Sequence, residues 1–398
     1  MKDLQKMTSI ELKSCSILAS VYGLRMLGMF LILPIFAIYA SNLDSNPTSL
    51  QIGLALGIYG LTQAIFQIPF GMSSDYFGRK KVIYFGLLLF IIGSLIAGHS
   101  TSIEGIILGR SIQGSGAISA VLTALLADIT REEQRTRAMA IIGASIGLTF
   151  ALSLVLSPWL NDVIGVNGIF ILMAILSFIA FLLVYFFIKE PEIRKEKAKT
   201  SADEFFKILK DINLFRMNFG IFVLHATQIS MFMIIPIYLV NQGGINLSDH
   251  WQIYLPILFF SFLLMIPIII FSEKFNKIKI AFLSSIIILF LAQLVFMIHG
   301  NTLFGIISAL LIYFVGFNFL EASLPSLVSK IAPINKKGLA LGVYNTSQSL
   351  GIFVGGALGG LITKVYGYNA SFVFCIALIF LWFVLSLGMQ VANFKKVN

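Results

Sequence analysis

Residues 82–98 read VIYFGLLLFIIGSLIAG, a run without a charged side chain. About 20 apolar residues in a helix, each rising 1.5 Å, cross the roughly 30 Å hydrocarbon core of a bilayer. Backbone amides inside lipid have no water to bond, so such a run must be helical, since the strands of a closed barrel would alternate and be about half as long. Together with its neighbours, this run predicts a transmembrane helix.

Twelve runs of this kind occur along the 398 residues. They begin near Ile17, Leu50, Val82, Ser102, Ala138, Gly168, Phe215, Trp251, Ile280, Thr302, Leu339 and Ala370. The composition agrees, because 58% of the residues are hydrophobic and 12% are charged, whereas an average soluble domain is about 25% charged. We therefore expect an all-α membrane protein, and the composition excludes an ordinary soluble enzyme, a nucleic-acid-binding module and a disordered protein.

The first run and the cysteines limit the alternatives further. The first run is too long for the apolar part of a signal peptide and no small-residue cleavage site follows it, so we expect a retained span. Cys15 and Cys375 both lie in apolar stretches, which leaves neither a disulfide framework nor a metal cluster. We expect no cofactor, no metal and no catalytic residue.

The basic residues predict the orientation in the membrane. The net charge is +10, but Lys and Arg occur in small groups between the apolar runs rather than on one basic face. With the N-terminus in the cytoplasm, only Lys364 lies on the outer side, Arg25 and Arg110 lie within spans, and the others are cytoplasmic. Because cytoplasmic loops carry the excess of Lys and Arg, both termini are expected in the cytoplasm.

An internal repeat predicts two similar halves. Five of the six starts in the first half reappear about 200 residues later, as with Leu50 and Trp251 or Val82 and Ile280. We expect two pseudo-symmetric six-helix bundles, residues 1–189 and 214–398, joined by a charged cytoplasmic linker, residues 190–213. Parallel repeats of this type occur in transporters that bind substrate between the halves, near the bilayer midplane.

The most specific motif lies between the second and third runs, where residues 71–81 read GMSSDYFGRKK. It resembles the loop signature of the major facilitator superfamily. The positive-inside rule alone explains Lys80 and Lys81 as anchors on the cytoplasmic side, but it does not explain Asp75. A carboxylate at this position can cap the N-terminus of a neighbouring helix. The candidate conformational switch comprises Gly71, Asp75, Gly78, Arg79 and Asp128.

The resemblance implies how this switch works. Asp75 would cap the start of span eleven, near residues 337–339, and hold the cytoplasmic side closed while the outside is open. Asp128, at the end of span four, would pair with Arg79, or would merely be a solvated helix end. The corresponding segment of the second half, residues 271–279, lacks the Asp and the Gly-Arg pair, so the switch is expected to be asymmetric.

Spans four and five carry two further motifs. Residues 108–116, LGRSIQGSG, contain Arg110 and Gln113 and look like the arginine signature of proton-linked members. An arginine inside a membrane normally faces a cavity or a partner, although backbone carbonyls at a helix break could also hold it.

Residues 143–158 resemble the glycine-and-proline signature of the drug/proton antiporter branch, with Gly143, Gly147 and Pro158 expected at helix-packing positions. The segment GASIG also matches the nucleophile elbow of hydrolases, but that motif needs a strand, a turn and a helix. We therefore expect no enzyme here. The glycine-rich part of span eleven, residues 351–360, is expected to pack closely in the same way.

Three more polar residues lie within spans: Arg25, His225 and Glu321. Arg25 and His225 are 200 positions apart, so the repeat puts them at matching depths, and all three can face one central cavity. His225 could instead be a packing residue with satisfied hydrogen bonds. Glu321 is the strongest candidate for proton coupling, since an intramembrane acid is expensive and is functional by default.

Across residues 8–389 the chain resembles the YajR-type drug/proton antiporters of the major facilitator superfamily. The resemblance implies a proton-driven exporter of small, drug-like or amphipathic compounds in a bacterial inner membrane, working as a monomer by alternating access, with protons, lipid and a small molecule as partners and no nucleic acid. YajR-type members carry a soluble domain after span twelve, which we expect this chain to lack. A metabolite facilitator or symporter of the same fold is the alternative.

The orientation is testable with reporter fusions. A reporter joined after Asn398 and one inserted within residues 190–213 should both lie in the cytoplasm, because basic residues flank those segments. The check is a pair of reporters with opposite compartment requirements at each position. An external reporter at either place would contradict the twelve-span prediction.

Overall fold

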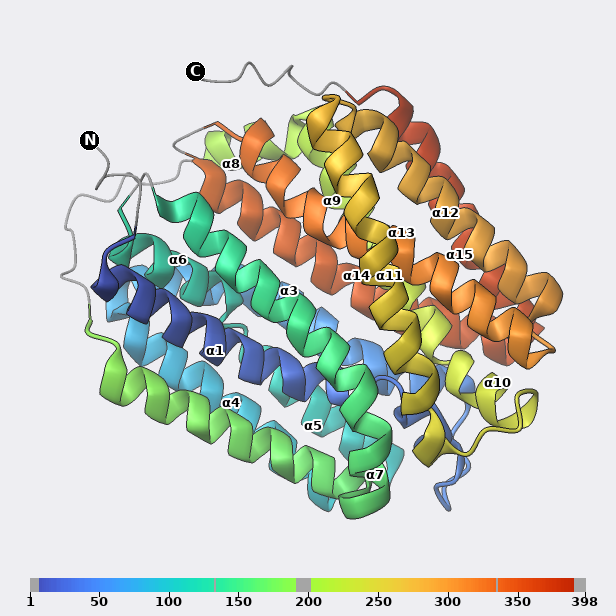
Figure 1. Cartoon of the computed structure of the whole chain (residues 1–398). Helices are drawn as coiled ribbons and strands as arrows, with labels where there is room; N and C mark the ends of the chain where they lie inside the picture. Colours follow the sequence, from blue (N-terminus) through green and yellow to red (C-terminus); the bar gives the residue numbers. More distant parts are fainter. Residues whose placement is uncertain (1–6, 132–133, 191–201, 334–335, 390–398) are drawn as a thin grey trace. The chain divides into compact units, whose positions relative to one another are not determined.

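The computed structural model describes residues 7–131, 134–190, 202–333 and 336–389. Over these residues the chain is helical and contains no strand (Figure 1). The elements are α1 (Ser9–Leu31), α2 (Phe36–Ser41), α3 (Ser49–Phe77), α4 (Arg79–His99), α5 (Ile103–Ser115), α6 (Ser119–Ile129), α7 (Arg135–Phe187), α8 (Ala202–Lys210), α9 (Ile212–Phe232), α10 (Ile235–Asn241), η3 (Leu247–Asp249), α11 (Trp251–Lys274), α12 (Ile278–His299), α13 (Leu303–Ile331), α14 (Lys337–Tyr366) and α15 (Tyr368–Leu387).

The described residues contain 11 helical segments that are long and apolar enough to cross a membrane. The difference from twelve arises in α7, whose 53 residues would extend for about 80 Å as one straight helix. Gly165 interrupts it with φ 66° and ψ 173°, and Figure 1 shows that the ribbon of α7 doubles back on itself. The two parts of α7 correspond to predicted spans five and six, so the all-α membrane class is confirmed.

Most helices begin within three residues of the expected position, but the first begins at Ser9 rather than near Ile17. Thr8 and Glu11 form a capping box at its start. The Thr8 hydroxyl accepts from the Glu11 amide at 3.2 Å, and the Glu11 carboxylate accepts from the Thr8 amide at 2.8 Å. Because these bonds satisfy two free amides, the helix extends into polar sequence that hydropathy alone assigns to the tail.

The chain divides into two compact units. The first comprises Met1–Pro47 and Ile58–Lys199, and the second comprises Thr48–Gly57 and Thr200–Asn398. The beginning of α3 therefore groups with the second unit. Of the predicted linker, residues 191–201 lie outside the described residues, and α8 occupies most of the remainder.

In the first unit α1 packs against the first part of α7, and α4 packs against the second part. The Ser153 hydroxyl donates to the Leu27 carbonyl at 3.4 Å, and the Ser157 hydroxyl donates to the Leu31 carbonyl. The ring of Tyr84 in α4 lies 4.6 Å from that of Phe181. These contacts join helices that are far apart in the sequence, and they build the core of this unit.

In the second unit, α14 packs closely on α9 through Gly351, Gly355 and Gly359. A Cβ atom built on these glycines would lie closer than 3.0 Å to the Phe222 carbonyl, the Ala226 carbonyl and the Ser230 hydroxyl respectively, a separation that real Cβ atoms do not tolerate. The spacing of four on both helices keeps the two backbones in contact over successive turns. The prediction of close packing by the glycines of span eleven is thus confirmed.

The prediction for Gly143 and Gly147 stays a prediction. Within the first unit a Cβ atom at either position meets no atom within 4 Å, so no described helix of that unit requires glycine there. Pro158 lies inside α7 and is buried. The pattern GASIG permits close packing, but only a facing helix backbone makes glycine necessary, and the sequence does not reveal where that backbone lies.

The contrast gives a matched pair of substitutions. Gly355→Ala should lower the midpoint of thermal unfolding, because its methyl group would displace the Ala226 backbone, an overpacking cost of about 1–3 kcal/mol. Gly147→Ala should leave the midpoint unchanged or raise it slightly, because the space is open and alanine favours a helix. Thermal unfolding of detergent-purified protein gives the midpoint of each variant. If the midpoint fell equally in the two variants, close packing of α14 on α9 would not require glycine at position 355.

Candidate functional site

Arg79 joins two carboxylates at the end of the first unit where α3 ends and α4 begins. Its Nη2 lies 2.7 Å from Oδ1 of Asp75, and its Nε lies 2.9 Å from Oδ2 of Asp128. Its Nη1 donates to the Ser74 hydroxyl. Arg79 is only 7% exposed, whereas the side chains of Asp75 and Asp128 are 40% and 32% exposed. One buried cation therefore connects α3, α4 and α6 by charge-assisted hydrogen bonds.

The two motif glycines differ in what their positions require. Gly78 precedes α4 with φ 95°, a conformation that other residues rarely adopt. A Cβ atom there would also lie 3.0 Å from Oε1 of Glu190. At Gly71 an added Cβ would lie 3.7 Å from the Cβ of Ala120, which is an ordinary contact. The turn into α4 thus demands glycine at position 78, and the described contacts make no such demand at position 71.

Glu190 is a contributor that the sequence did not reveal. Its Oε2 accepts from the Lys80 amide in the first turn of α4, at 3.2 Å. The Lys80 ammonium donates to the Ile188 carbonyl at 2.6 Å. Glu190 thus places a negative charge at the N-terminus of α4, where the helix dipole favours it. In the sequence it looks like the first residue of a solvated linker.

A second ion pair, also missed from the sequence, lies close to Asp128 along the chain. Glu11 is buried and accepts through Oε1 from both the amide and Nε of Arg131 at 3.0 Å, and through Oε2 from Nη2 at 3.0 Å. The Thr130 hydroxyl lies 3.7 Å from the Cys15 sulfur. The segment after α6 is thereby fixed to α1. The pairing spans 120 residues, so no local pattern signals it.

Arg25 lies in the interior of the first unit, where α5 gives way to α6. It is 1% exposed, and its Nη1 donates to the Ser119 hydroxyl at 2.8 Å. Its Nη2 donates to the Gly116 carbonyl at 3.1 Å and to Oε1 of Gln63 at 3.4 Å. Gly116 follows the last residue of α5, and its carbonyl also accepts from the Ile118 amide at 2.9 Å, so Arg25 adds a second donor where the helix breaks.

Arg110 and Gln113 lie on the same helix, α5, and contact each other. Arg110 is 3% exposed and donates through Nη1 to Oε1 of Gln113 at 3.0 Å. The Gln113 amide donates in turn to the Ser94 hydroxyl at 2.8 Å. The Arg110 guanidinium carbon lies 4.9 Å from the centroid of the Tyr59 ring, which is within the range of a cation–π contact. The structure thus places both candidates inside the first unit and brings them together.

His225 and Glu321 lie in the second unit and differ in their partners. His225 is buried in α9, with Nδ1 3.3 Å from the Ile221 carbonyl and Nε2 2.8 Å from Nε2 of Gln348. A neutral ring that donates from Nδ1 and accepts from the Gln348 amide satisfies both nitrogens. Glu321 lies within α13, and its Oε2 is buried without a hydrogen-bond partner in the described structure.

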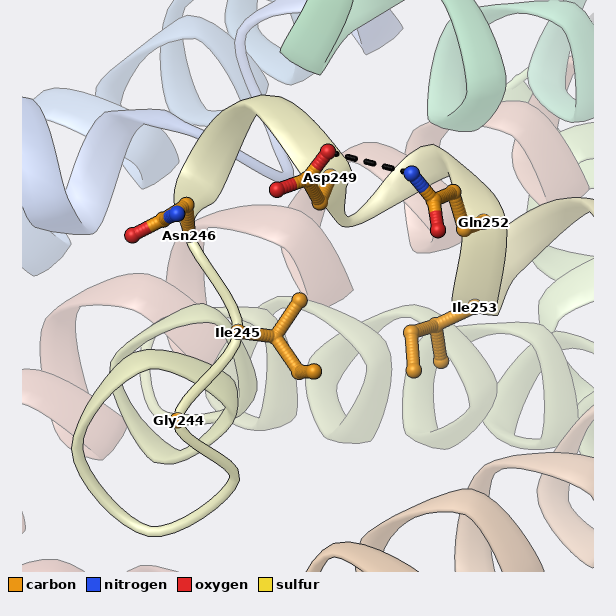
Figure 2. A pocket seen from close by; sticks show the side chains of 6 residues that line it. All are labelled: Gly244, Ile245, Asn246, Asp249, Gln252 and Ile253. Atoms are coloured by element: carbon orange, nitrogen blue, oxygen red, sulfur yellow. Dashed lines mark hydrogen bonds between the residues drawn. The ribbon is translucent and has the colours of Figure 1, made fainter.

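A small pocket lies elsewhere in the second unit, in the connection between α10 and α11 (Figure 2). Its volume is about 200 Å³, and its lining includes Asp249, whose Oδ1 accepts from the Gln252 amide at 3.1 Å. The other lining residues are Gly244, Ile245, Asn246 and Ile253. None of the predicted site residues contributes to it, so the pocket is separate from the groups described above.

Two helical units with buried cations and an intramembrane acid define a membrane transporter, and the comparisons agree. The Major Facilitator Superfamily model matches residues 18–356 and 322–392. The chain belongs to this superfamily, and it is a transporter rather than an enzyme.

Individual relatives extend the comparison. The inner membrane transport protein YajR of Escherichia coli is 40% identical, over 97% of this chain and 85% of its own length. Multidrug resistance protein 2 of Bacillus subtilis is 27% identical, over 94% of this chain and 92% of its own. A bacterial homologue of the human lysosomal transporter Spinster, in an inward-facing and occupied conformation, has a TM-score of 0.76 at 12% identity, covering 96% of this chain and 97% of its own. The YajR-type resemblance is confirmed, and the structural match supports the fold.

Proposed function

We propose that this transporter exports small, amphipathic or drug-like compounds in exchange for protons. The observation that carries the proposal is Glu321, because one oxygen of its carboxyl group is buried within α13 without a hydrogen-bond partner among the described residues. Intramembrane acids in transporters commonly belong to proton pathways. The name of the Bacillus subtilis relative, a multidrug resistance protein, supports the export of drug-like compounds.

We further propose that the protein works as a monomer in a bacterial inner membrane, with both termini in the cytoplasm. The inner-membrane relative from Escherichia coli and the distribution of the basic residues support this orientation. In this orientation the Arg79 contacts face the cytoplasm, and residues 1–189 and 214–398 act as the two moving halves joined by residues 190–213.

The Arg79 contacts would act as the switch between the conformations. In the proposed cycle Asp75 caps α14 when the cytoplasmic side is closed, while Arg79 and Asp128 hold its carboxylate in position. The ion pair between Arg79 and Asp75 supports this role, because it orients the Asp75 carboxylate. The orientation of the chain in the membrane does not by itself explain an acidic residue at this position. Opening toward the cytoplasm would replace the helix-capping interaction with water.

Asp75→Asn should shift the population toward the inward-open state. The lost charge is worth roughly 0.3–1 kcal/mol at a helix end, and up to ~2 kcal/mol if partly buried. The population ratio should therefore change by roughly two- to fivefold, and by up to ~30-fold if Asp75 is partly buried in the closed state. Cysteines introduced one at a time along residues 338–346, in a background without Cys15 and Cys375, report the change by labelling from the cytoplasm. Asp44→Asn, an exposed acid in the loop after α2, is the control. Unchanged labelling in Asp75→Asn would reject the switch.

Glu321→Gln should separate substrate binding from proton coupling. The amide mimics the protonated acid, so the variant should bind substrate and exchange it by counterflow, yet lose transport driven by a pH gradient. The assay uses proteoliposomes and compounds first identified by their dissipation of an imposed pH gradient with the wild-type protein, and Asp44→Asn should behave as wild type.

The outcomes distinguish the alternatives. If Glu321→Gln pumps against a gradient at the wild-type rate, the proton site is elsewhere, and Asp128 or His225 becomes the next candidate. If the wild-type protein moves compounds without any dependence on the pH gradient, the chain is a facilitator of the same fold.

A further inference from the structure

The interior of the first unit contains a cation without an acidic partner. Arg25 makes its hydrogen bonds to a hydroxyl, an amide oxygen and a backbone carbonyl, and no ion pair joins it to a carboxylate within the described residues. Its Nε and the hydroxyl of the neighbouring Tyr59 are both buried without hydrogen-bond partners there. The hydrogen-bond partners of Arg25 are therefore all neutral, and one of its donors is unused.

A second cation and two aromatic rings surround this position. The Arg25 guanidinium carbon lies 6.0 Å from the Tyr59 ring and 5.9 Å from the Phe90 ring. Arg110 lies 4.9 Å from the same Tyr59 ring, so the two guanidinium carbons are at most about 11 Å apart. Two positive charges thus lie near one another in a region of low dielectric constant, beside two buried rings that pack edge to face on each other.

A purely structural role accounts for only part of this arrangement. Arg25 contacts the Gly116 carbonyl at the break between α5 and α6, but that carbonyl also accepts from the Ile118 amide at 2.9 Å, so the break does not require a charged donor. A buried charge is costly unless an opposite charge approaches it. The guanidinium fork, with a free Nε donor, matches the geometry of carboxylate and phosphate oxygens.

We propose that Arg25, with Tyr59 and Arg110, binds the carboxylate or phosphate group of a small organic anion that the protein transports. The proposal rests on the proposed transport function and names its substrate class. The anion takes the unused Nε donor of Arg25 and the hydroxyl of Tyr59.

Thermal unfolding of the full chain in neutral detergent tests the binding. The probes are 2-naphthoate, 1-naphthyl phosphate and the neutral 2-naphthamide, at ionic strength matched with chloride. Naphthoate or naphthyl phosphate should raise the unfolding midpoint by roughly 2–4 °C, while naphthamide should not. The proposal would be overturned if naphthamide raised the unfolding midpoint as much as naphthoate does. It would also be overturned if chloride or inorganic phosphate alone raised the midpoint by as much as naphthoate.

Gln63→Glu provides a sharper test, because it introduces a carboxylate of the same shape where Oε1 of Gln63 already accepts from Arg25. This variant should unfold at a higher temperature than wild type and lose the response to naphthoate. Gln293→Glu is the matched control. Gln293 is buried in α12, and its amide has no partner in the described structure, so an acid there should lower the midpoint and leave the naphthoate response intact.

A naphthoate response that persists in Gln63→Glu would reject Arg25 as the anion site. If that variant fails to fold, the comparison of naphthoate with naphthamide on the wild-type protein still decides the proposal. Binding in detergent does not depend on a pH gradient, so proton coupling can fail in the Glu321→Gln experiment while anion binding stands, and the reverse also holds.

Discussion

Hydrocarbon offers no hydrogen bonds, and this constraint determines how the polar groups within the described spans are held. Helices satisfy the backbone, and where a helix breaks a side chain adds a donor, as Arg25 does at the Gly116 carbonyl. Ser153 and Ser157 donate across to carbonyls of α1. A polar atom that remains without a partner inside a span is therefore expensive, and the proposals for proton coupling and anion binding rest on such atoms of Glu321 and Arg25.

Close helix packing is the second organising feature, and it separates rigid from adaptable contacts. Along α14, backbone touches backbone through glycine on the side that faces α9. At the end of the first unit, ionic contacts join the helices instead, through Arg79 and through Glu11 with Arg131. Ionic contacts at a half-exposed helix end can exchange with water, whereas the glycine contacts cannot. A transporter that moves rigid bundles by exchanging contacts at their ends requires both kinds.

The sequence predicted what depends on length and composition, and it missed what depends on distant partners. The spans were predictable because a bilayer fixes their length and excludes charges. The start of α1 was missed although Thr8 and Glu11 form a local capping pattern, whereas the ion pair of Glu11 with Arg131 has no local signal because it spans 120 residues. Glu190 was missed for the same reason. The packing role of the glycines of α7 stays a prediction, because their spacing does not reveal which backbone they face. Pairing of Arg79 with Asp128 could be expected only through the family resemblance, and the structure brings those side chains together.

The central claim is that Glu321 gains and loses a proton as the protein works. Infrared difference spectroscopy of the reconstituted protein measures this directly, because a protonated carboxyl group in an apolar site absorbs apart from ionised carboxylates and amides. We expect a carboxyl band that appears in the wild-type protein as the pH is lowered and is missing in Glu321→Gln, with the rest of the titration unchanged. Identical difference spectra for the two proteins would contradict the claim.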